Sequence, residues 1–122
     1  MIDLELVLSI HEQILSVKQG LKGGADLGKL ESALNRITHW QLYENTENIF
    51  DIASLYAVAI AKAHAFSDGN KRTAMVTMLS YLKMQGVIIK ENQGLDDVMV
   101  LVASSKMSMS ELSEFLQKNC VD

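Results

Sequence analysis

The residues best suited to chemistry in this sequence lie close together, between positions 64 and 74. His64 supplies an imidazole, which can accept a proton near neutral pH. Asp68 supplies a carboxylate, an oxygen ligand of the kind that Mg²⁺ prefers. Lys71 and Arg72 supply two adjacent positive charges directly after a Gly-Asn turn. A base, a metal ligand and paired cations are components of a phosphate-handling site.

These residues must be positioned by the helices expected on either side of them. Apolar residues at helical spacing predict one long helix that runs into His64, and a second helix that ends at Gly86. The first amides of the second helix, around Asn70 to Thr73, would point out of its N-terminus, where the helix dipole favours an anion. Gly69 would let the backbone approach that anion closely. Lys71 and Arg72 are unfavourable for the helix at this position, so a bound anion would remove a conflict.

A purely structural interpretation of the same residues stays open at this point. In it, Phe66 fills the core, Asp68 and Asn70 cap a helix, and Lys71 and Arg72 form a solvated face. The residue types alone do not separate this interpretation from a phosphate site.

The remaining patterns predict an all-α fold: a compact bundle of about six helices in a single domain, residues 1–122, with a possible small β-ribbon or flap. Further helices are expected over residues 4–15, 27–37 and 95–102, and a capping box at Ser108 and Glu111 opens a last one. Residues 19–26 are expected to form a flexible connector, residues 38–48 a loop or short hairpin, and residues 87–89 a strand.

The whole-chain composition narrows the class of function. Apolar residues make up 48% of the chain and charged residues 21%, the balance of a folded globular protein. The net charge of −4 disfavours general binding to nucleic acid. The N-terminus has no secretory pattern, no apolar stretch is long enough for a bilayer, and the single Cys120 suits a reducing compartment, so we expect a cytoplasmic protein.

The central segment resembles the signature of the Fic family in its Doc (death-on-curing toxin) form, through the run His64-x-Phe66-x-Asp68-Gly69-Asn70-Lys71-Arg72-Thr73. The stretch from Asp26 to Leu34 and the pair Tyr43-Glu44 are similar to the corresponding Doc stretches, so the resemblance covers nearly the whole chain. It implies an all-α enzyme that transfers part of a nucleoside triphosphate to a protein hydroxyl.

The resemblance also implies a role for each residue of the motif. His64 would deprotonate a target serine or threonine, and Asp68 would help to hold Mg²⁺. The bound nucleotide, ATP, would contact the segment of Phe66, Gly69, Asn70, Lys71 and Arg72. By the same resemblance, the target would be elongation factor Tu, and a Phd-like antitoxin would be the inhibitory partner.

Departures from the usual Fic signature help to choose between two reactions. Most Fic enzymes transfer AMP, whereas Doc transfers the γ-phosphate. Lys71 replaces a glycine of the usual signature, Met75 replaces a second arginine, and Ala65 replaces a proline. A lysine side chain would crowd the bare backbone nest that cradles phosphates, which favours γ-phosphate transfer. An AMP transferase and a non-catalytic module that binds nucleotide or protein remain alternatives.

Two other segments bear on the site. His11 lies on the apolar stripe of the first helix and is expected to be a partly buried, hydrogen-bonded residue rather than a ligand. In the family, the segment ahead of the long central helix forms a flap that aligns the target peptide, and residues 38–48 match that position. Docking of a target there and plain loop packing are both open.

Overall fold

The computed structural model describes residues 2–17, 24–45 and 47–121, which form six helices and one short two-stranded ribbon. In chain order they are α1 (Leu4–Val17), α2 (Leu27–Glu44), α3 (Ile49–Ala63), α4 (Asn70–Met84), β1 (Ile88–Ile89), α5 (Leu95–Ala103), α6 (Met109–Lys118) and β2 (Cys120–Val121). The predicted all-α fold class is confirmed. No helix in the described ranges has the length and apolar character that crossing a membrane requires.

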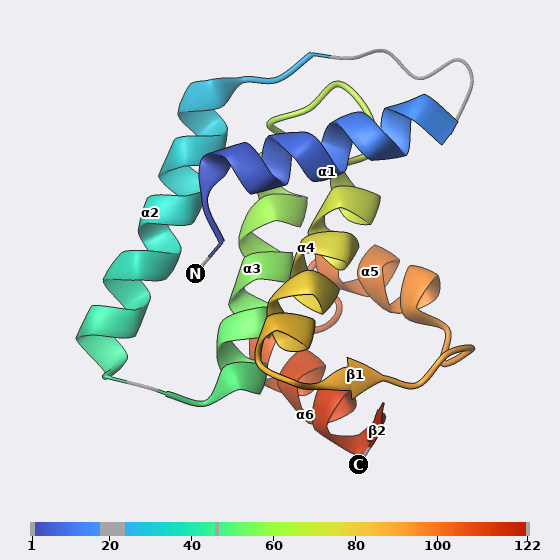
Figure 1. Cartoon of the computed structure of the whole chain (residues 1–122). Coiled ribbons are helices and arrows are strands. Elements are labelled where there is room, and N and C mark those ends of the chain that lie inside the picture. The colour runs from blue at the N-terminus through green and yellow to red at the C-terminus, as the bar shows by residue number, and fades with distance from the viewer. Residues whose placement is uncertain (1, 18–23, 46, 122) are drawn as a thin grey trace.

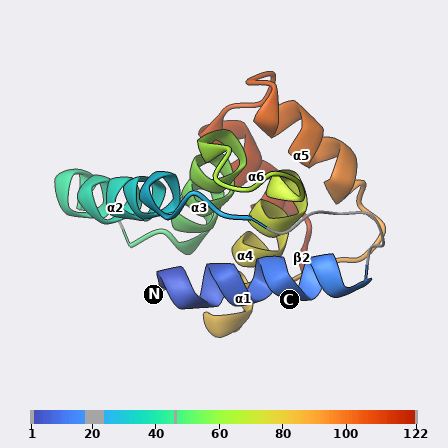
Figure 2. The same ribbon diagram turned by 90° about the horizontal axis from the view of Figure 1, so that it is seen from above.

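Helix α3 is the central element of the bundle, and α2, α4, α5 and α6 all pack against it (Figure 1). Its buried alanines, among them Ala53, Ala57 and Ala61, leave room for close neighbours on several sides. Helix α1 lies across α4, as the view turned by 90° also shows (Figure 2). The segment between α3 and α4, which carries the candidate motif, is therefore held by the most buried helix of the protein.

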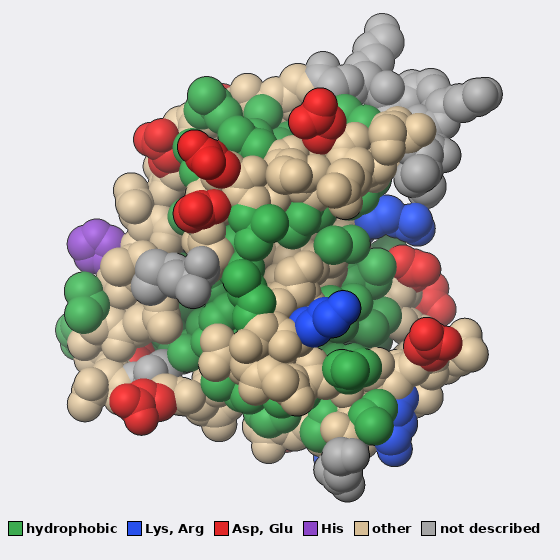
Figure 3. Space-filling view, viewed as in Figure 1, with side chains coloured by type: hydrophobic (Ala, Val, Ile, Leu, Met, Phe, Trp, Pro, Cys, Tyr) green, Lys and Arg blue, Asp and Glu red, His purple; other side chains and the backbone are tan. Residues whose placement is uncertain are grey.

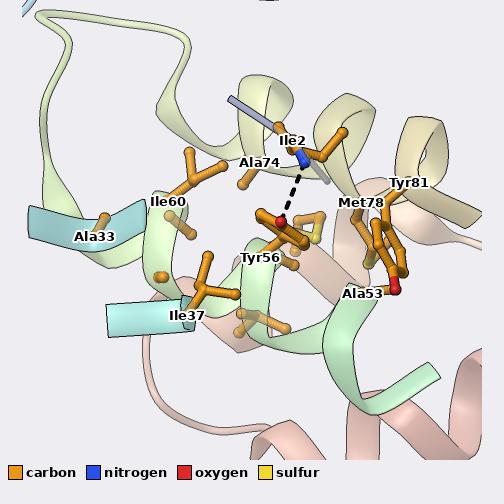
Figure 4. Packing of buried hydrophobic residues seen from close by; sticks show 14 of the residues in the cluster. Ile2, Ala33, Ile37, Ala53, Tyr56, Ile60, Ala74, Met78 and Tyr81 are labelled. Carbon is orange, nitrogen blue, oxygen red and sulfur yellow. Dashed lines mark hydrogen bonds between the residues drawn. The ribbon is translucent and has the colours of Figure 1, made fainter. Parts of the chain in front are cut away.

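The core around α3 combines aliphatic side chains with two tyrosines (Figure 4). The Tyr56 ring is 2% exposed and lies 5.3 Å, centroid to centroid, from the ring of Tyr81 on α4. The Tyr56 hydroxyl accepts a hydrogen bond from the backbone N–H of Ile2 at 3.2 Å, which ties the N-terminus to the core. Burial raises the pKa of Tyr56 above its ordinary value, so the hydroxyl keeps its proton at neutral pH.

The end of α4 follows the predicted stop at Gly86, which has a φ of 82°. The N–H of Val87 bonds the carbonyl of Leu82 at 2.9 Å, and the N–H of Gly86 bonds that of Lys83 at 3.0 Å. This pair of bonds is a Schellman motif, in which a left-handed glycine satisfies the last carbonyls of the helix. The chain then enters β1, as predicted, and β1 pairs antiparallel with β2 at the far end of the sequence.

One predicted boundary is wrong: the second helix does not end near residue 37 but continues to Glu44. Residues 38–44 are thus helical, and the expected loop or hairpin is absent from them. The spacing of apolar residues did not indicate this part of the helix, because the C-terminal end of α2 is poorly covered by other elements. Leu42 is 78% exposed and Tyr43 is 88% exposed, so its apolar residues do not mark a buried face.

The same correction bears on the predicted flap over residues 38–48, because its residues 38–44 belong to α2. This segment leads into Ile49 at the start of α3, whereas His64 follows the other end of that helix (Figure 1). A helix of 15 residues spans about 22 Å at 1.5 Å per residue. The helical residues 38–44 therefore lie toward the end of α3 that is opposite to His64. Most of the predicted connector, residues 19–23 of 19–26, is outside the described residues.

Candidate active site

The motif forms the wall of a pocket between the end of α3, the start of α4 and one side of α5. His64 ends α3 as its C-cap in the left-handed conformation, with a φ of 51°, and its side chain is exposed. The pocket has a volume of about 580 Å³, within the range of small-molecule sites. Its motif residues are His64, Ser67, Asp68, Gly69, Asn70, Lys71 and Arg72, and its α5 residues are Asp96, Met99, Val100 and Ala103.

The start of α4 differs from the other helix starts in the described chain. Helices α2, α3 and α6 each have a side-chain N-cap, and α1 and α5 have acidic residues in the first turn. Helix α4 has neither feature: its N-cap is Gly69, no side chain caps it, and Lys71 and Arg72 lie in its first turn. Since helix N-termini favour negative charge, this start is electrostatically suited to a bound anion.

Asn70 braces the loop through its side-chain amide. The Oδ1 atom accepts from the N–H of Phe66 at 3.1 Å, and Nδ2 donates to the carbonyl of the same residue at 2.9 Å. The side-chain amide of Asn70 thus satisfies both backbone polar groups of Phe66, as a neighbouring β-strand would. The structural interpretation in which Asp68 and Asn70 cap the helix is wrong, because Gly69 is the N-cap and neither side chain caps α4.

Phe66, which the resemblance places against the nucleotide, is part of the hydrophobic core. Its side chain is 4% exposed and does not line the pocket described above. The ring stacks on the imidazole of His11, with centroids 3.8 Å apart and an angle of 13° between the planes. On the other side of the loop, the backbone N–H of Asp26 donates to the carbonyl of Ala65 at 2.6 Å. The loop is therefore anchored from both α1 and the start of α2.

His11 is 5% exposed, and its Nε2 atom lies 2.9 Å from the carbonyl oxygen of Asp68. The prediction of a buried, hydrogen-bonded histidine is confirmed. The carboxylate of Asp68 itself is exposed and accepts a hydrogen bond from the N–H of Gly69 at 2.7 Å. One backbone unit of the loop is thus bonded on both of its sides.

The charged side chains of the pocket are balanced two against two. Arg72 Nη2 lies 3.8 Å from Asp96 Oδ1, and both side chains are substantially exposed, at 42% and 75%. An ion pair this long and exposed contributes little, and a phosphate could replace it. Asp96 is a pocket residue that the sequence analysis missed, because nothing local relates the start of α5 to a motif some 25 residues earlier along the chain.

Asp68 is suited to Mg²⁺ only if other ligands come from elsewhere. The described residues contain no group of three or more His, Cys, Asp or Glu side chains that could hold a metal ion. Mg²⁺ commonly takes one or two carboxylates and completes its shell with substrate phosphates and water. The Asp68 carboxylate, which directly precedes the N-cap of an anion-favouring helix start, fits that arrangement.

A second hollow, of about 550 Å³, adjoins the motif loop and is lined by residues 24–26 and 64–67. It shares His64 and Ser67 with the first pocket. Ala25 forms an antiparallel bridge with Phe66, so this hollow has a backbone edge along one side. His64 therefore lines both the charged pocket and this second hollow, which is bordered by the bridged backbone of Ala25 and Phe66.

Among the described residues, the face of the molecule shown in Figure 3 has no comparable pair of adjacent cations. On the side shown in Figure 3, acidic side chains lie over α1 and basic side chains are scattered. The paired cations at the start of α4 are a local feature of an acidic protein.

The fold and the pocket define a class: a small helical protein with an anion-favouring helix start, an adjacent exposed histidine and a neighbouring carboxylate. The model of the Fic/DOC family matches residues 1–82, and the chain belongs to this family. It is also similar to the protein described as "Protein kinase doc" of Escherichia phage P1, with 32% identity over 114 residues. That alignment covers 93% of this chain and 90% of the phage protein. The resemblance drawn from the motif is confirmed.

Proposed function

We propose that this protein is a Doc-type toxin, an ATP-dependent protein kinase that transfers the γ-phosphate of ATP to a serine or threonine hydroxyl. By resemblance, the substrate is a translation factor, elongation factor Tu, and its phosphorylation arrests translation. The observation that carries the proposal is the start of α4, where two cations and free helix amides face a pocket that His64 borders. The similarity to a protein kinase, with an alignment that covers 90% or more of both chains, supports the reaction class.

In this proposal each motif residue has a distinct task. His64 accepts the proton of the attacking hydroxyl, which reaches it from the hollow beside residues 24–26. The amides at the start of α4, with Lys71 and Arg72, bind the phosphates from the other side. Phosphoryl transfer depends chiefly on this alignment and on charge neutralisation.

Mg²⁺ would be held by Asp68 together with phosphate oxygens, and when bound it supplies positive charge against the developing negative charge. Arg72 would exchange its loose contact with Asp96 for a phosphate oxygen. Asn70 contributes mainly by bracing the loop, because both ends of its amide are bonded to the backbone of Phe66.

Lys71 supports γ-phosphate transfer over AMP transfer. Its exposed side chain lines the pocket at the second position of α4, where a glycine would leave the backbone bare. A side chain at this position occupies space that a cradled diphosphate needs in AMP-transferring relatives. The terminal phosphate, rather than the α-phosphate, would then be presented to His64.

An antitoxin partner is part of the same proposal. A groove of about 540 Å³ lies between α4 and the start of α5, with Met75, Leu79, Ile89 and Leu95 among its apolar residues. Asp96 lines both this groove and the charged pocket. An amphipathic segment that folds as a helix in the groove would reach the mouth of the pocket. Co-expression with a small protein encoded beside the toxin gene should relieve growth arrest.

The reaction is tested by incubating the protein with elongation factor Tu and ATP labelled separately on its α- and γ-phosphates. Transfer of the γ-label alone is the expected result. Transfer of the α-label would mean AMP transfer, and transfer of neither label would favour a binding module.

His64→Asn is the variant to compare in the same assay. Asparagine tolerates the left-handed backbone of this position, so the fold should survive, whereas the base is lost. The transfer rate should fall by about 10²- to 10⁴-fold, the usual contribution of a general base. An undiminished rate would exclude His64 from catalysis.

A further inference from the structure

His11 is a buried titratable residue that the proposed reaction does not use, yet it touches the motif loop at three points. Its Nε2 atom lies 2.9 Å from the carbonyl oxygen of Asp68. Its ring stacks on Phe66 at 3.8 Å between centroids. A Cβ atom built on Gly69 would lie 3.6 Å from its Cδ2 atom, so the imidazole lies directly against this glycine. Core packing alone does not require a hydrogen bond to this carbonyl.

The hydrogen bond defines which ring nitrogen of His11 acts as the donor, and it fixes the orientation of one peptide plane. A carbonyl oxygen only accepts, so Nε2 of His11 carries the proton and donates it. In a trans peptide the C=O and N–H groups point in opposite directions. The carbonyl of Asp68 points toward the buried imidazole, so the N–H of Gly69 points the other way, to the exposed Asp68 carboxylate at 2.7 Å.

The opposite orientation of this peptide plane would be unfavourable for binding an anion in the pocket. It would direct a carbonyl, the negative end of the peptide dipole, toward the anion, and it would bury an N–H against α1. Glycine makes such a reorientation accessible, because its φ can take either sign at similar cost. Gly69 has a φ of 80°, the conformation that the present orientation demands. The hydrogen bond from His11 to the inward carbonyl of Asp68 therefore favours the present orientation over the opposite one.

We propose that His11 is a positioning residue, which holds the peptide plane between Asp68 and Gly69 so that an N–H rather than a carbonyl faces the pocket. The proposal rests on the proposed function for its effect on nucleotide binding, but the orientation itself does not depend on it. Through this contact, helix α1 sets the phosphate affinity of a loop more than fifty residues away along the chain.

Two variants of His11 separate its hydrogen bond from its packing. His11→Phe keeps an aromatic ring to stack on Phe66 and removes the donor. His11→Gln removes the stack but places a side-chain N–H donor at a similar distance from the backbone. Val7→Ala is the matched control: Val7 is fully buried on the same helix, and its truncation lowers stability while the ring and the hydrogen-bond donor of His11 stay in place.

The affinity for Mg²⁺-ATP is measured by calorimetry well below the unfolding temperature of each variant. For His11→Phe we expect the dissociation constant to rise about tenfold, the upper range for one lost hydrogen bond. His11→Gln should stay within about threefold of the wild type, and Val7→Ala should match it despite a lower Tm. Equal affinity in His11→Phe and the wild type would overturn the proposal, as would equal losses in the Phe and Gln variants.

The orientation is followed separately through the ¹H–¹⁵N resonance of the Gly69 amide. It should shift strongly in His11→Phe and little in His11→Gln; an unchanged resonance in His11→Phe would refute the orienting role. This measurement needs no nucleotide. If the wild type binds no Mg²⁺-ATP, the proposed function fails, while the amide resonance still decides whether His11 orients the plane.

Discussion

Two helix starts in this protein solve the same structural problem in opposite ways. Each α-helix begins with amides that lack a partner within the helix. At α6, Ser108 Oγ accepts from the N–H of Glu111 at 3.1 Å, and the Glu111 carboxylate accepts from the N–H of Ser108 at 3.0 Å. At α4, Gly69 takes the capping position, no side chain accepts from the helix amides, and Lys71 occupies the first turn.

The difference separates what stabilises the fold from what binds a ligand. The start of α6 is capped by its own side chains: the N–H groups of Ser108 and Glu111 are bonded, and an acid is favourably placed against the helix dipole. The start of α4 carries an electrostatic cost that a bound anion would remove. Replacing side chains at α4 should therefore affect activity with little loss of stability, and replacing them at α6 should do the reverse.

The largest effect that this comparison predicts is at Arg72. Arg72→Gln should lower the rate of phosphate transfer by about 10²- to 10³-fold, because one donor to the transferring group is lost. Its free energy of unfolding should stay within about 1 kcal/mol of the wild type, since only the exposed contact with Asp96 disappears. Transfer kinetics and denaturant unfolding, measured on the same preparation, give the rate and the free energy of unfolding. A loss of stability that accounts for the loss of rate would make the α4 start an ordinary structural element.

Lys71 tests whether the α4 start selects the reaction as well as the anion. Lys71→Gly should allow α-phosphate transfer, raising the ratio of α- to γ-label on the target by about tenfold, because the backbone nest becomes accessible. Glycine also loosens the first turn, so Lys71→Ala is the control that removes the charge but retains a Cβ. Unchanged label ratios in both variants would show that crowding by Lys71 does not decide the reaction.

Features carried by neighbouring residues could be predicted from the sequence. The helices on both sides of the motif, the stop at Gly86 and the capping box at Ser108 are all local patterns, and the structure contains each of them. The motif residues converge on one pocket for the same reason: they follow one another along a loop and the first turn of a helix.

Contacts between distant segments could not be predicted in this way. The bond from His11 to Asp68 and the approach of Asp96 to Arg72 depend on how α1 and α5 pack against α4. The length of α2 was missed for a different reason. Its last two turns continue a capped helix into solvent, where exposed side chains such as Tyr43 carry no periodic signal.

Ser108 provides the reverse of the Arg72 experiment, with a smaller effect. Ser108→Ala should lower the free energy of unfolding by about 1 kcal/mol, the typical cost of losing an N-cap side chain. The rate of phosphate transfer per folded molecule should not change, because α6 does not line the pocket. Denaturant unfolding measures the first quantity and the labelled-ATP assay the second. A parallel loss of rate would couple the two helix starts and break the contrast between them.

The smallest effect concerns the titration of the α6 cap. The backbone N–H of Ser108, and then its hydroxyl, bond the Glu111 carboxylate and lower its pKa below the ordinary value of 4.5. A carboxyl whose pKa is lower in the folded state stabilises the fold above its unfolded pKa, and this contribution is lost as the pH falls through the lowered value.

Glu111→Gln keeps an acceptor oxygen for Ser108 but does not titrate. Between about pH 6 and about pH 3, the Tm of the wild type should therefore fall slightly more than that of Glu111→Gln. Since α4 has no acid in its first turn, no equivalent low-pH loss should arise from its start, and parallel curves for the two proteins would mean that the cap at α6 does not depend on charge either.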